Sequence, residues 1–461
     1  MLKVLLTVTI TYSYLCIVRG NYYHDNPKIR QVPAVGEPGQ PLILTPLIEA
    51  GDIQQARNAS RVGSLDQTLD LESYSGFFTV DKKYDSNMFF WYFPAEDGNA
   101  SAPVILWLQG GPGSSSLFGL FTENGPYIYS LDNQLERRQY SWSNKHHLIY
   151  IDNPVGTGFS FTNSSEGYSR NEISVGNNLY EALVQFFTIF SELQGNEFFI
   201  AGESYGGKYV PAASYAILKR NPNKEIKINL KGIAIGNGLC DPAHMMLYGD
   251  HLYQMGLIDV NAREHFYQVE HLIRQRISEQ DWESAMELRL NLLDDYLYNL
   301  TDYKYLYNFL YTRNPRRFGD YDIYLQQEET RKAIHVGDSE YHDSDLVAIY
   351  LSDDVMQSIS PWLVELLANY RVLIYSGQLD LRISYTLTLG YLQALEWDGA
   401  QEYRTADRYQ WHVGTDLAGF VKTAANLTEV LVRNSGHMVP TDQPEWAYTL
   451  ISKFVRDQSL H

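Results

Sequence analysis

The sequence predicts an α/β fold with a mostly parallel central sheet and a helical insertion. Two observations lead to this prediction: short, nearly all-apolar runs closed by Gly recur along the chain, and amphipathic helix patterns lie between them. Strands that alternate with helices favour parallel pairing, because each helix carries the chain back across the sheet. A third observation is one long region, 241–355, that holds no clear apolar run and therefore predicts an insertion of helices.

Six runs have the composition of strands that are buried on both faces. Nearly continuous apolar strands of this length are typical of parallel sheets that helices cover on both sides. The runs are Val104–Leu108, His147–Ile151, Glu197–Ala201, Gly232–Gly236, Val372–Tyr375 and Glu429–Val432.

Helix patterns fill gaps between these runs. Between 178 and 193, Leu and Phe residues recur at steps of three and four, which indicates one buried helical face. Ser360-Pro361 predicts the start of a second helix, with Ser360 as the N-cap and Pro361 at the first helical position.

We expect the chain to divide into five segments. Residues 1–20, a Lys followed by an apolar run and small residues, have the pattern of a secretory signal peptide, and no later stretch is long enough for a membrane span. Residues 21–70 are polar and rich in Pro and Gly, which indicates an extended arm over the surface. The segments 71–240 and 356–461 would form the two parts of the core, with 241–355 as a cap between them.

The charge balance narrows the choice of partners. The chain carries 55 Asp and Glu against 36 Lys and Arg, a net charge of -19. An acidic surface repels phosphate backbones and anionic lipids, so we expect no nucleic acid partner and no anionic membrane surface. No His or Cys spacing suggests a metal site, and no cofactor is expected. The sequence leaves a homodimer open.

The secretory interpretation gains support from glycosylation sequons. Cys240 is the one cysteine outside the signal segment, so the mature chain cannot form an internal disulfide, and we expect Cys240 to be a small buried apolar residue. The destination, outside the cell or in lysosomes, stays open. The five Asn-x-Ser/Thr sites are Asn58, Asn99, Asn163, Asn299 and Asn426.

The segment Gly202-Glu-Ser-Tyr-Gly206 matches the pattern G-x-S-x-G. It follows an apolar run and precedes a helix-compatible run, 208–218. A strand-to-helix turn this sharp needs Gly where a side chain would clash, and it holds the central Ser above the sheet edge. Ser204 is therefore the predicted nucleophile, and it needs a base to take its proton.

His437 and Asp380 are the predicted partners of Ser204. Folds with this turn carry their groups in the chain order Ser, acid, His, and both residues follow predicted strands at the edge where ligands collect. His437 would act as general base and then as acid, while Asp380 fixes the imidazole tautomer. Asp152 also ends a strand but precedes Ser204, so we expect a turn or packing role for it.

The Gly-rich turn within Trp107–Ser116 follows the first predicted strand. Such a turn can point backbone N–H groups at a developing oxyanion. The N–H groups of Gly111 and Tyr205 are the natural pair.

Five motifs resemble the serine carboxypeptidase family from about residue 70 to the C-terminus. They are Trp107–Ser116, Glu123–Pro126, Asp152–Ser160, Gly202–Gly207 and Gly436–Pro444. Gln109, Ala333–Gly337 and Ser376–Asp380 most resemble the vitellogenic-carboxypeptidase-like branch. The resemblance implies an α/β-hydrolase fold and the removal of single residues from peptide or protein C-termini.

The resemblance also implies a site for the substrate's terminal carboxylate. The matching positions are Gln109, Glu123 and Glu203 with the Gly110 N–H, and Met438 resembles a residue that lines the leaving-group pocket. A carboxyl that stays protonated can donate a hydrogen bond to a carboxylate, and two neighbouring acids hold one proton more readily than one acid alone. Activity is therefore expected to peak at acidic pH, as far as a neutral His base allows.

Two positions depart from the family pattern, and two other functions stay open. Gln109 stands where much of the family has Asn, which keeps an amide donor, and Ser114 stands where Cys is common. An acyltransferase would use the same machinery with an alcohol in place of water. A binding, chaperone-like or yolk-associated protein would have a dispensable site, and the intact predicted triad argues against it.

Overall fold

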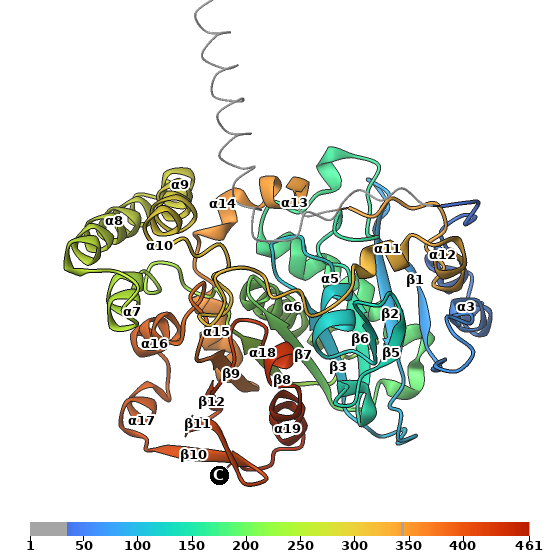
Figure 1. Ribbon diagram of the computed structural model, residues 1–461. Helices are drawn as coiled ribbons and strands as arrows, with labels where there is room; N and C mark the ends of the chain where they lie inside the picture. Colours follow the sequence, from blue (N-terminus) through green and yellow to red (C-terminus); the bar gives the residue numbers. More distant parts are fainter. Residues whose placement is uncertain (1–34, 343–344, 461) are drawn as a thin grey trace, which may run out of the picture.

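The computed structural model describes residues 35–342 and 345–460, and a ten-stranded sheet forms their centre (Figure 1). The strand order is β1-β2-β6-β3-β7-β8-β9-β12-β11-β10. The six neighbours from β6 to β12 run parallel to one another, which confirms the predicted α/β class. The predicted signal peptide lies outside the described residues.

The six parallel strands are the six runs predicted from sequence, with differences only at some ends. Their alternate residues point to opposite faces: in β3, Leu106 belongs to one apolar cluster and Ile105 to the other. Both faces therefore need a cover of helices. The strands are β3 (Val104–Leu108), β6 (His147–Ile151), β7 (Phe198–Glu203), β8 (Leu230–Gly236), β9 (Arg371–Gly377) and β12 (Leu427–Val432).

Both edges of the sheet are antiparallel, and the sequence patterns did not predict them. β1 (Tyr74–Asp81) and β2 (Ser86–Phe93) form a hairpin that joins the sheet through β6. β10 (Arg408–Val413) and β11 (Asp416–Ala424) form the other edge against β12. A separate small sheet pairs two short strands, β4 (Tyr127–Tyr129) and β5 (Leu135–Arg137).

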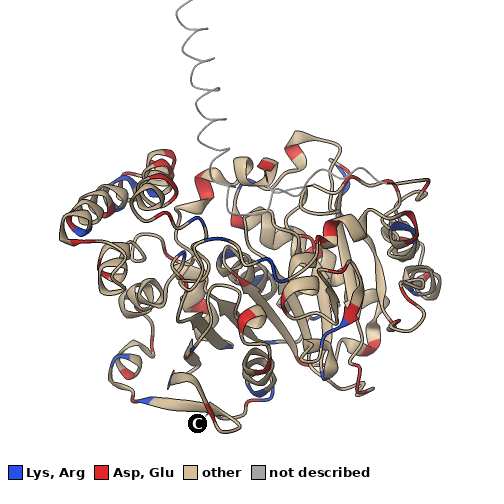
Figure 2. Cartoon of the chain, in the orientation of Figure 1, with Lys and Arg blue, Asp and Glu red and all other residues tan. Residues whose placement is uncertain are grey.

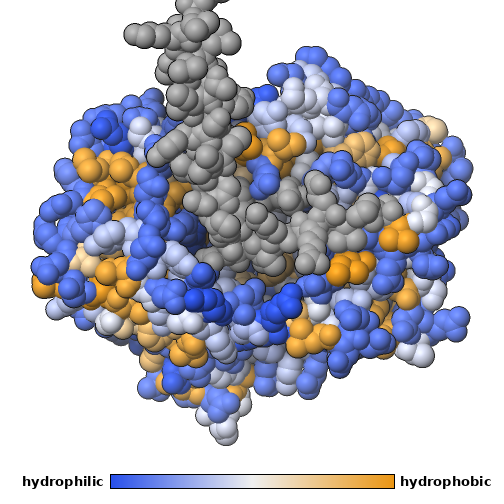
Figure 3. Space-filling model, turned by 45° about the horizontal axis from the view of Figure 1, so that its top comes forward, coloured by the Kyte–Doolittle hydropathy of each residue, from blue (hydrophilic) through white to orange (hydrophobic). Residues whose placement is uncertain are grey.

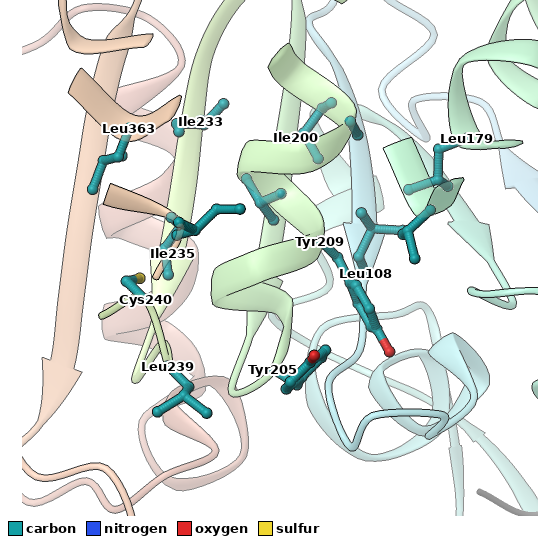
Figure 4. Close-up of a cluster of buried hydrophobic side chains, with 14 of the residues drawn as sticks. Leu108, Leu179, Ile200, Tyr205, Tyr209, Ile233, Ile235, Leu239, Cys240 and Leu363 are labelled. Carbon is teal, nitrogen blue, oxygen red and sulfur yellow. The ribbon is translucent and has the colours of Figure 1, made fainter. Parts of the chain in front are cut away.

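Helices cover both faces of the sheet. On one face, α5 (Glu172–Ile189), α6 (Gly206–Arg220) and α15 (Ser360–Leu367) bury their apolar sides, and Figure 4 shows Leu108 and Ile200 gathered near Tyr209 of α6. On the other face, α19 (Pro444–Phe454) packs with its Trp, Leu, Ile and Phe side chains. The remaining helices of the core are α4 (Ser116–Phe118), α16 (Tyr385–Ala394), α17 (Ala400–Thr405) and α18 (Val439–Asp442).

Short helical turns connect several of these elements. Five have irregular or tight geometry, and one of them, η1, carries a predicted site residue at its end. They are the π-helical turn η1 (Gly119–Glu123) and the 3₁₀ turns η2 (Trp142–Asn144), η3 (Ser165–Gly167), η4 (Ser191–Leu193) and η5 (Asn221–Asn223).

One predicted helix start needs correction, and another helix begins before the apolar pattern that predicted it. α5 begins before residue 178, because the side chain of Asn171 accepts a hydrogen bond from a first-turn N–H and so caps the helix there. Ser360 was predicted as the N-cap of α15, but it is the first helical residue and Ile359 is the cap. The Ser360 hydroxyl instead lies 3.1 Å from Asp241 Oδ2, a contact across the fold that the local sequence does not encode.

The predicted arm, 21–70, is not extended throughout its described part. It contains two short helices, α2 (Thr45–Glu49) and α3 (Ile53–Ser60). Leu44 and Ala56 from this segment are fully buried in the core cluster, so apolar packing outweighs the Pro- and Gly-rich composition. Across the described residues, no helix has the length and apolar character that a membrane crossing requires.

Between β8 and α15 the chain forms helices and loops and adds no strand to the sheet within its described residues. In Figure 1, α7–α10 gather to one side of the sheet and α11–α14 lie across its top. The elements are α7 (Tyr248–Gln254), α8 (Val260–Ser278), α9 (Trp282–Leu290), the π-helical η6 (Asn291–Leu297), α10 (Tyr298–Thr301), α11 (Tyr321–Leu325), α12 (Glu328–Ala333), α13 (Asp345–Tyr350) and α14 (Ser352–Val355).

Acidic and basic residues are interspersed over the molecule, including the insertion helices (Figure 2). On the face drawn in Figure 3, hydrophobic patches are separated by hydrophilic surface. Cys240 is fully buried beside Leu239, as predicted (Figure 4). Burial raises the pKa of the Cys240 thiol to about 12, so the thiol is protonated and unreactive near neutral pH.

Candidate active site

Ser204 lies in the sharp turn between β7 and α6. Its backbone φ of 63° falls in the left-handed region, which is strained for a residue with a side chain. A Cβ added to Gly202 would lie 2.6 Å from the Leu108 carbonyl oxygen, and one added to Gly206 would lie 2.9 Å from the same oxygen. The two Gly residues therefore let the turn pack against β3 and hold Ser204 at the carboxyl edge of the sheet.

Asp380 and His437 form a buried hydrogen-bonded pair. His437 Nδ1 lies 2.7 Å from Asp380 Oδ2, and neither side chain is more than 3% exposed. Asp380 Oδ1 accepts hydrogen bonds from the backbone N–H groups of Arg382 and Ile383 at 2.8 and 3.2 Å. An acceptor fixed in this way keeps the proton of His437 on Nδ1. His437 Nε2 makes no hydrogen bond to any residue in the described ranges, so it is the nitrogen left for proton transfer.

Asn237 supports this pair, and the sequence patterns did not single it out. Its Nδ2 donates to Asp380 Oδ2 at 2.7 Å, and its Oδ1 accepts from the Gly377 N–H at 3.1 Å. Asn237 follows the last residue of β8, at the same sheet edge as the loops of Asp380 and His437. The rule that selected those two residues would therefore have found Asn237 as well.

The Gly-rich loop after β3 packs directly on the Ser204 turn. A Cβ on Gly110 would lie 2.6 Å from the Tyr205 nitrogen and 2.7 Å from Ser204 Cβ. Gly111, with φ of 112°, turns the chain away in a conformation that favours Gly. Tyr205 immediately precedes α6, so its N–H belongs to the positive end of that helix. The loop and the helix start thus supply neighbouring backbone donors beside Ser204.

Asp152 holds the same loop in place through hydrogen bonds. Its Oδ1 accepts hydrogen bonds from Ser115 Oγ at 2.5 Å and from the Ser116 N–H at 3.1 Å, and its Oδ2 accepts from the Phe159 N–H at 2.8 Å. Burial raises the pKa of Asp152 to about 7. Asp152 therefore has a packing role that shapes the loop.

The predicted carboxylate-binding residues lie together next to this loop. Gln109 Nε2 lies 3.4 Å from Glu203 Oε1, and Gln109 Oε1 accepts from Trp107 Nε1 at 2.9 Å, which fixes the orientation of the amide. A Cβ on Gly119 would lie 2.2 Å from Trp107 Nε1, so Gly at this position leaves room for the indole. Glu123 ends η1 and is buried against Glu203.

The two carboxyl groups perturb each other. Burial raises the pKa of Glu123 to about 7. Burial and the neighbouring Glu123 carboxyl raise the pKa of Glu203 well above its usual range. The pair therefore retains at least one proton at acidic and neutral pH, and a proton held there can be donated to an anionic ligand.

The other predicted sites are also placed by the fold. Met438 follows His437 directly and is half-buried. In the described part of the chain, no cluster of His, Cys, Asp or Glu could hold a metal ion. All five sequon residues lie in the described part of the chain, and none of them is buried. They are Asn58, Asn99, Asn163, Asn299 and Asn426.

The chain matches a family model and several characterised sequences. The model described as serine carboxypeptidase matches residues 63–457. A venom serine carboxypeptidase of Apis mellifera is 51% identical over 458 residues, which cover 97% of this chain and 98% of that protein. A vitellogenic carboxypeptidase of Aedes aegypti is 46% identical over 435 residues, which cover 92% of each chain.

A solved structure has the same architecture. It is that of KEX1(DELTA)P, a prohormone-processing carboxypeptidase from Saccharomyces cerevisiae, with a TM-score of 0.76 and 25% sequence identity. The match covers 87% of this chain and 96% of that chain. This likeness and the parallel sheet confirm the predicted α/β-hydrolase fold.

Proposed function

This chain belongs to the serine carboxypeptidase family, and from that premise we propose that Ser204, His437 and Asp380 release single residues from the C-termini of peptides. The observation that carries the proposal is the buried Asp380–His437 hydrogen bond of 2.7 Å at the sheet edge that also holds the strained Ser204 turn. A serine hydroxyl becomes nucleophilic when an oriented imidazole takes its proton.

The reaction proceeds in two halves. Ser204 Oγ attacks the carbonyl carbon of the last peptide bond while His437 Nε2 takes the hydroxyl proton, and the N–H groups of Gly111 and Tyr205 bind the oxyanion. The intermediate then collapses, the C–N bond breaks, and His437 returns its proton to the leaving amine. A water molecule next attacks the acyl-enzyme with His437 as base, which releases the shortened peptide and restores Ser204.

Selection for the last residue comes from its free carboxylate. Gln109 Nε2, the Gly110 N–H and the proton shared by Glu123 and Glu203 donate hydrogen bonds to that carboxylate. The raised pKa values of the two Glu residues support this assignment, because an ionised pair would repel the substrate. Binding should weaken as the pH rises through about 7, where Glu123 loses its proton.

The surroundings of the site support further assignments. Met438, next to His437, lines the pocket for the leaving residue, and the segment 241–355 caps the site. The accessible sequons and the apolar segment 1–20 support a glycoprotein of the secretory pathway that is delivered outside the cell or to lysosomes.

The test is the pH dependence of release of the last residue from an N-blocked dipeptide, with the matching C-terminal amide and the Ser204→Ala variant alongside. We expect acid-favoured release from the free acid, weak action on the amide, and a loss of about 10³-fold or more in Ser204→Ala. Equal cleavage of acid and amide would refute the carboxylate site. Transfer to an added alcohol in preference to hydrolysis would favour the acyltransferase, and no cleavage of any peptide would favour a binding protein.

A further inference from the structure

A segment of the insertion is hydrogen-bonded to the loop that carries Asp380. The Leu381 N–H donates to the Leu306 carbonyl at 2.9 Å, and the Phe309 N–H donates to the Leu379 carbonyl at 2.7 Å. These two bonds lie on either side of Asp380 in the chain. The backbone of 306–309 therefore lies beside the acid of the triad.

The same segment contacts the loop that carries His437. The His437 N–H donates to the Tyr307 carbonyl at 2.6 Å, and the rings of Tyr307 and His437 have centroids 5.0 Å apart. A Cβ on Gly436 would lie 2.1 Å from the Tyr307 carbonyl oxygen and 2.7 Å from Asn308 Cβ. Gly436 is thus required for the insertion to approach this loop, and the orientation of His437 depends on that approach.

Asp442 connects the insertion and the His437 loop through one carboxylate. Its Oδ2 accepts from Asn308 Nδ2 at 2.8 Å and from the Gly436 N–H at 2.6 Å, while its Oδ1 pairs with Arg317 at 2.5 Å. Asn308 is 4% exposed, so water cannot readily replace its hydrogen bond. The backbone on the N-terminal side of His437 is therefore held by a buried amide–carboxylate contact that reaches across the fold.

We propose that Asn308 and Asp442 are positioning residues for His437. They touch no reacting atom. They fix the Gly436 backbone and the insertion segment, and so keep the imidazole in hydrogen-bonding distance of Asp380 with Nε2 directed at Ser204. The proposal rests on the triad assigned above. Small displacements of a general base lower the rate of proton transfer with little effect on substrate binding.

The test uses Asn308→Ala and Asn308→Asp, with an alkyl fluorophosphonate as probe. Ser204 Oγ displaces fluoride from phosphorus while His437 takes the hydroxyl proton, so labelling needs the triad but no terminal carboxylate. For Asn308→Ala we expect labelling slowed about tenfold at every pH, and for the dipeptide a similar fall in kcat with little change in KM.

Asn308→Asp gives a pH signature that a purely structural residue would not give. Near pH 4.5, one proton shared with Asp442 restores the hydrogen bond, so we expect labelling at about the wild-type rate. Near pH 7, the introduced carboxyl is ionised and repels the Asp442 carboxylate, so we expect labelling at least about tenfold slower than wild type at the same pH. The charged or titratable neighbours include Arg317, which forms an ion pair with Asp442, and His437 with the Tyr307 ring beside it. Tyr305 is a further neighbour, and burial raises its pKa, so it stays neutral.

Arg313→Ala is the matched control. It removes an exposed ion pair with Asp302 in the same part of the insertion and leaves Asn308 and Asp442 intact, so it should be labelled at the wild-type rate. If Asn308→Ala does not fold, the comparison of Asn308→Asp at pH 4.5 and at pH 7 carries the test.

Wild-type rates for both Asn308 variants at both pH values would overturn the proposal. A wild-type protein that is labelled at Ser204 but releases no C-terminal residue would refute the proposed function while the positioning role stands on the labelling data. A wild-type protein that is not labelled would refute the triad, and the positioning role with it.

Discussion

At the scale of the residue, the proposed selection of substrate depends on protons held by two buried carboxyls. Glu123 is the member whose pKa lies near neutrality, at about 7, so its ionisation would place the first negative charge beside the bound carboxylate. Glu203, with its pKa raised further, keeps its proton longer. The pH dependence of KM should therefore reflect the ionisation of Glu123 more than that of Glu203.

Glu123→Gln should flatten the rise of KM with pH. The amide cannot ionise. We therefore expect the ratio of KM at pH 8 to KM at pH 5 to be about tenfold smaller in the variant than in wild type. KM for the free-acid dipeptide, measured from pH 5 to 8, checks this. The C-terminal amide substrate is the control, because it has no terminal carboxylate for an ionised Glu123 to repel. A KM profile in the variant that parallels wild type would contradict the assignment of Glu123.

Asn237→Ala should lower kcat by about tenfold and leave KM nearly unchanged. The change removes one donor from Asp380 Oδ2, while the backbone donors of Arg382 and Ile383 still hold Oδ1. The kinetics of the dipeptide substrate measure the effect. Because Asn237→Asp would place a second carboxylate next to Asp380, it should be more damaging, and the opposite ranking would argue against a hydrogen-bond role.

At the scale of the element, a buried charge cluster joins α6 to the insertion helix α14. Lys208 Nζ lies 3.1 Å from Asp354 Oδ2, and the Tyr205 hydroxyl donates to the same oxygen at 2.9 Å. Lys208 and Asp354 are separated by 146 positions in the chain. Since Tyr205 is also the proposed oxyanion donor, the docking of α14 stabilises the start of α6 beside Ser204.

Lys208→Met should destabilise the protein by about 3–5 kcal/mol, because it leaves the buried Asp354 carboxylate without its charged partner. Urea unfolding measures the change. Lys219→Met is the control on the same helix: its ion pair with Glu365 is exposed, so its removal should leave the free energy of unfolding nearly unchanged. Equal effects of the two substitutions would mean that the buried pair does not fasten α14.

At the scale of the whole molecule, several buried acids favour an acidic environment. Burial raises the pKa values of Asp152 and Glu270 to about 7 and that of Glu172 well above its usual range. The folded state therefore binds these protons more tightly than the unfolded chain does. The contribution of these groups to the free energy of unfolding should be nearly constant below their pKa values in the unfolded chain. It should fall as the pH rises from about 4.5 to 7.

Thermal unfolding between pH 4.5 and 7.5 tests this expectation. Glu270→Gln keeps an acceptor for the Gly249 N–H, which Glu270 binds at 2.8 Å, and should regain up to about 3 kcal/mol at pH 7 with little change at pH 4.5. Glu264→Gln, on the exposed side of the same helix, is the control. An effect of Glu270→Gln that is equal at pH 4.5 and at pH 7 would contradict the role assigned to Glu270.

The sequence by itself determined the core strands and the turn that holds the proposed nucleophile. The strands β3 and β6 have the predicted bounds, and Ser204 lies in the predicted strand-to-helix turn. These features depend on neighbours in the chain: an apolar run fits a covered strand, and Gly residues permit a turn that larger residues would block. The β10–β11 hairpin was not predicted, because β10 is partly exposed and mixes polar with apolar residues. The β1–β2 hairpin was not predicted either, although every residue of β2 is buried.

Only the tertiary structure decided which residues hold the reacting groups in place. Asn308 and Asp442 are 134 positions apart, and Asn237 and Asp380 are 143 apart, yet each pair forms one hydrogen bond. No local pattern encodes these contacts, because each depends on how the insertion and the strand ends pack in three dimensions. The same holds for the raised pKa values of Glu123 and Glu203. Their burial, and the Glu123 carboxyl that further raises the pKa of Glu203, arise only when distant segments meet.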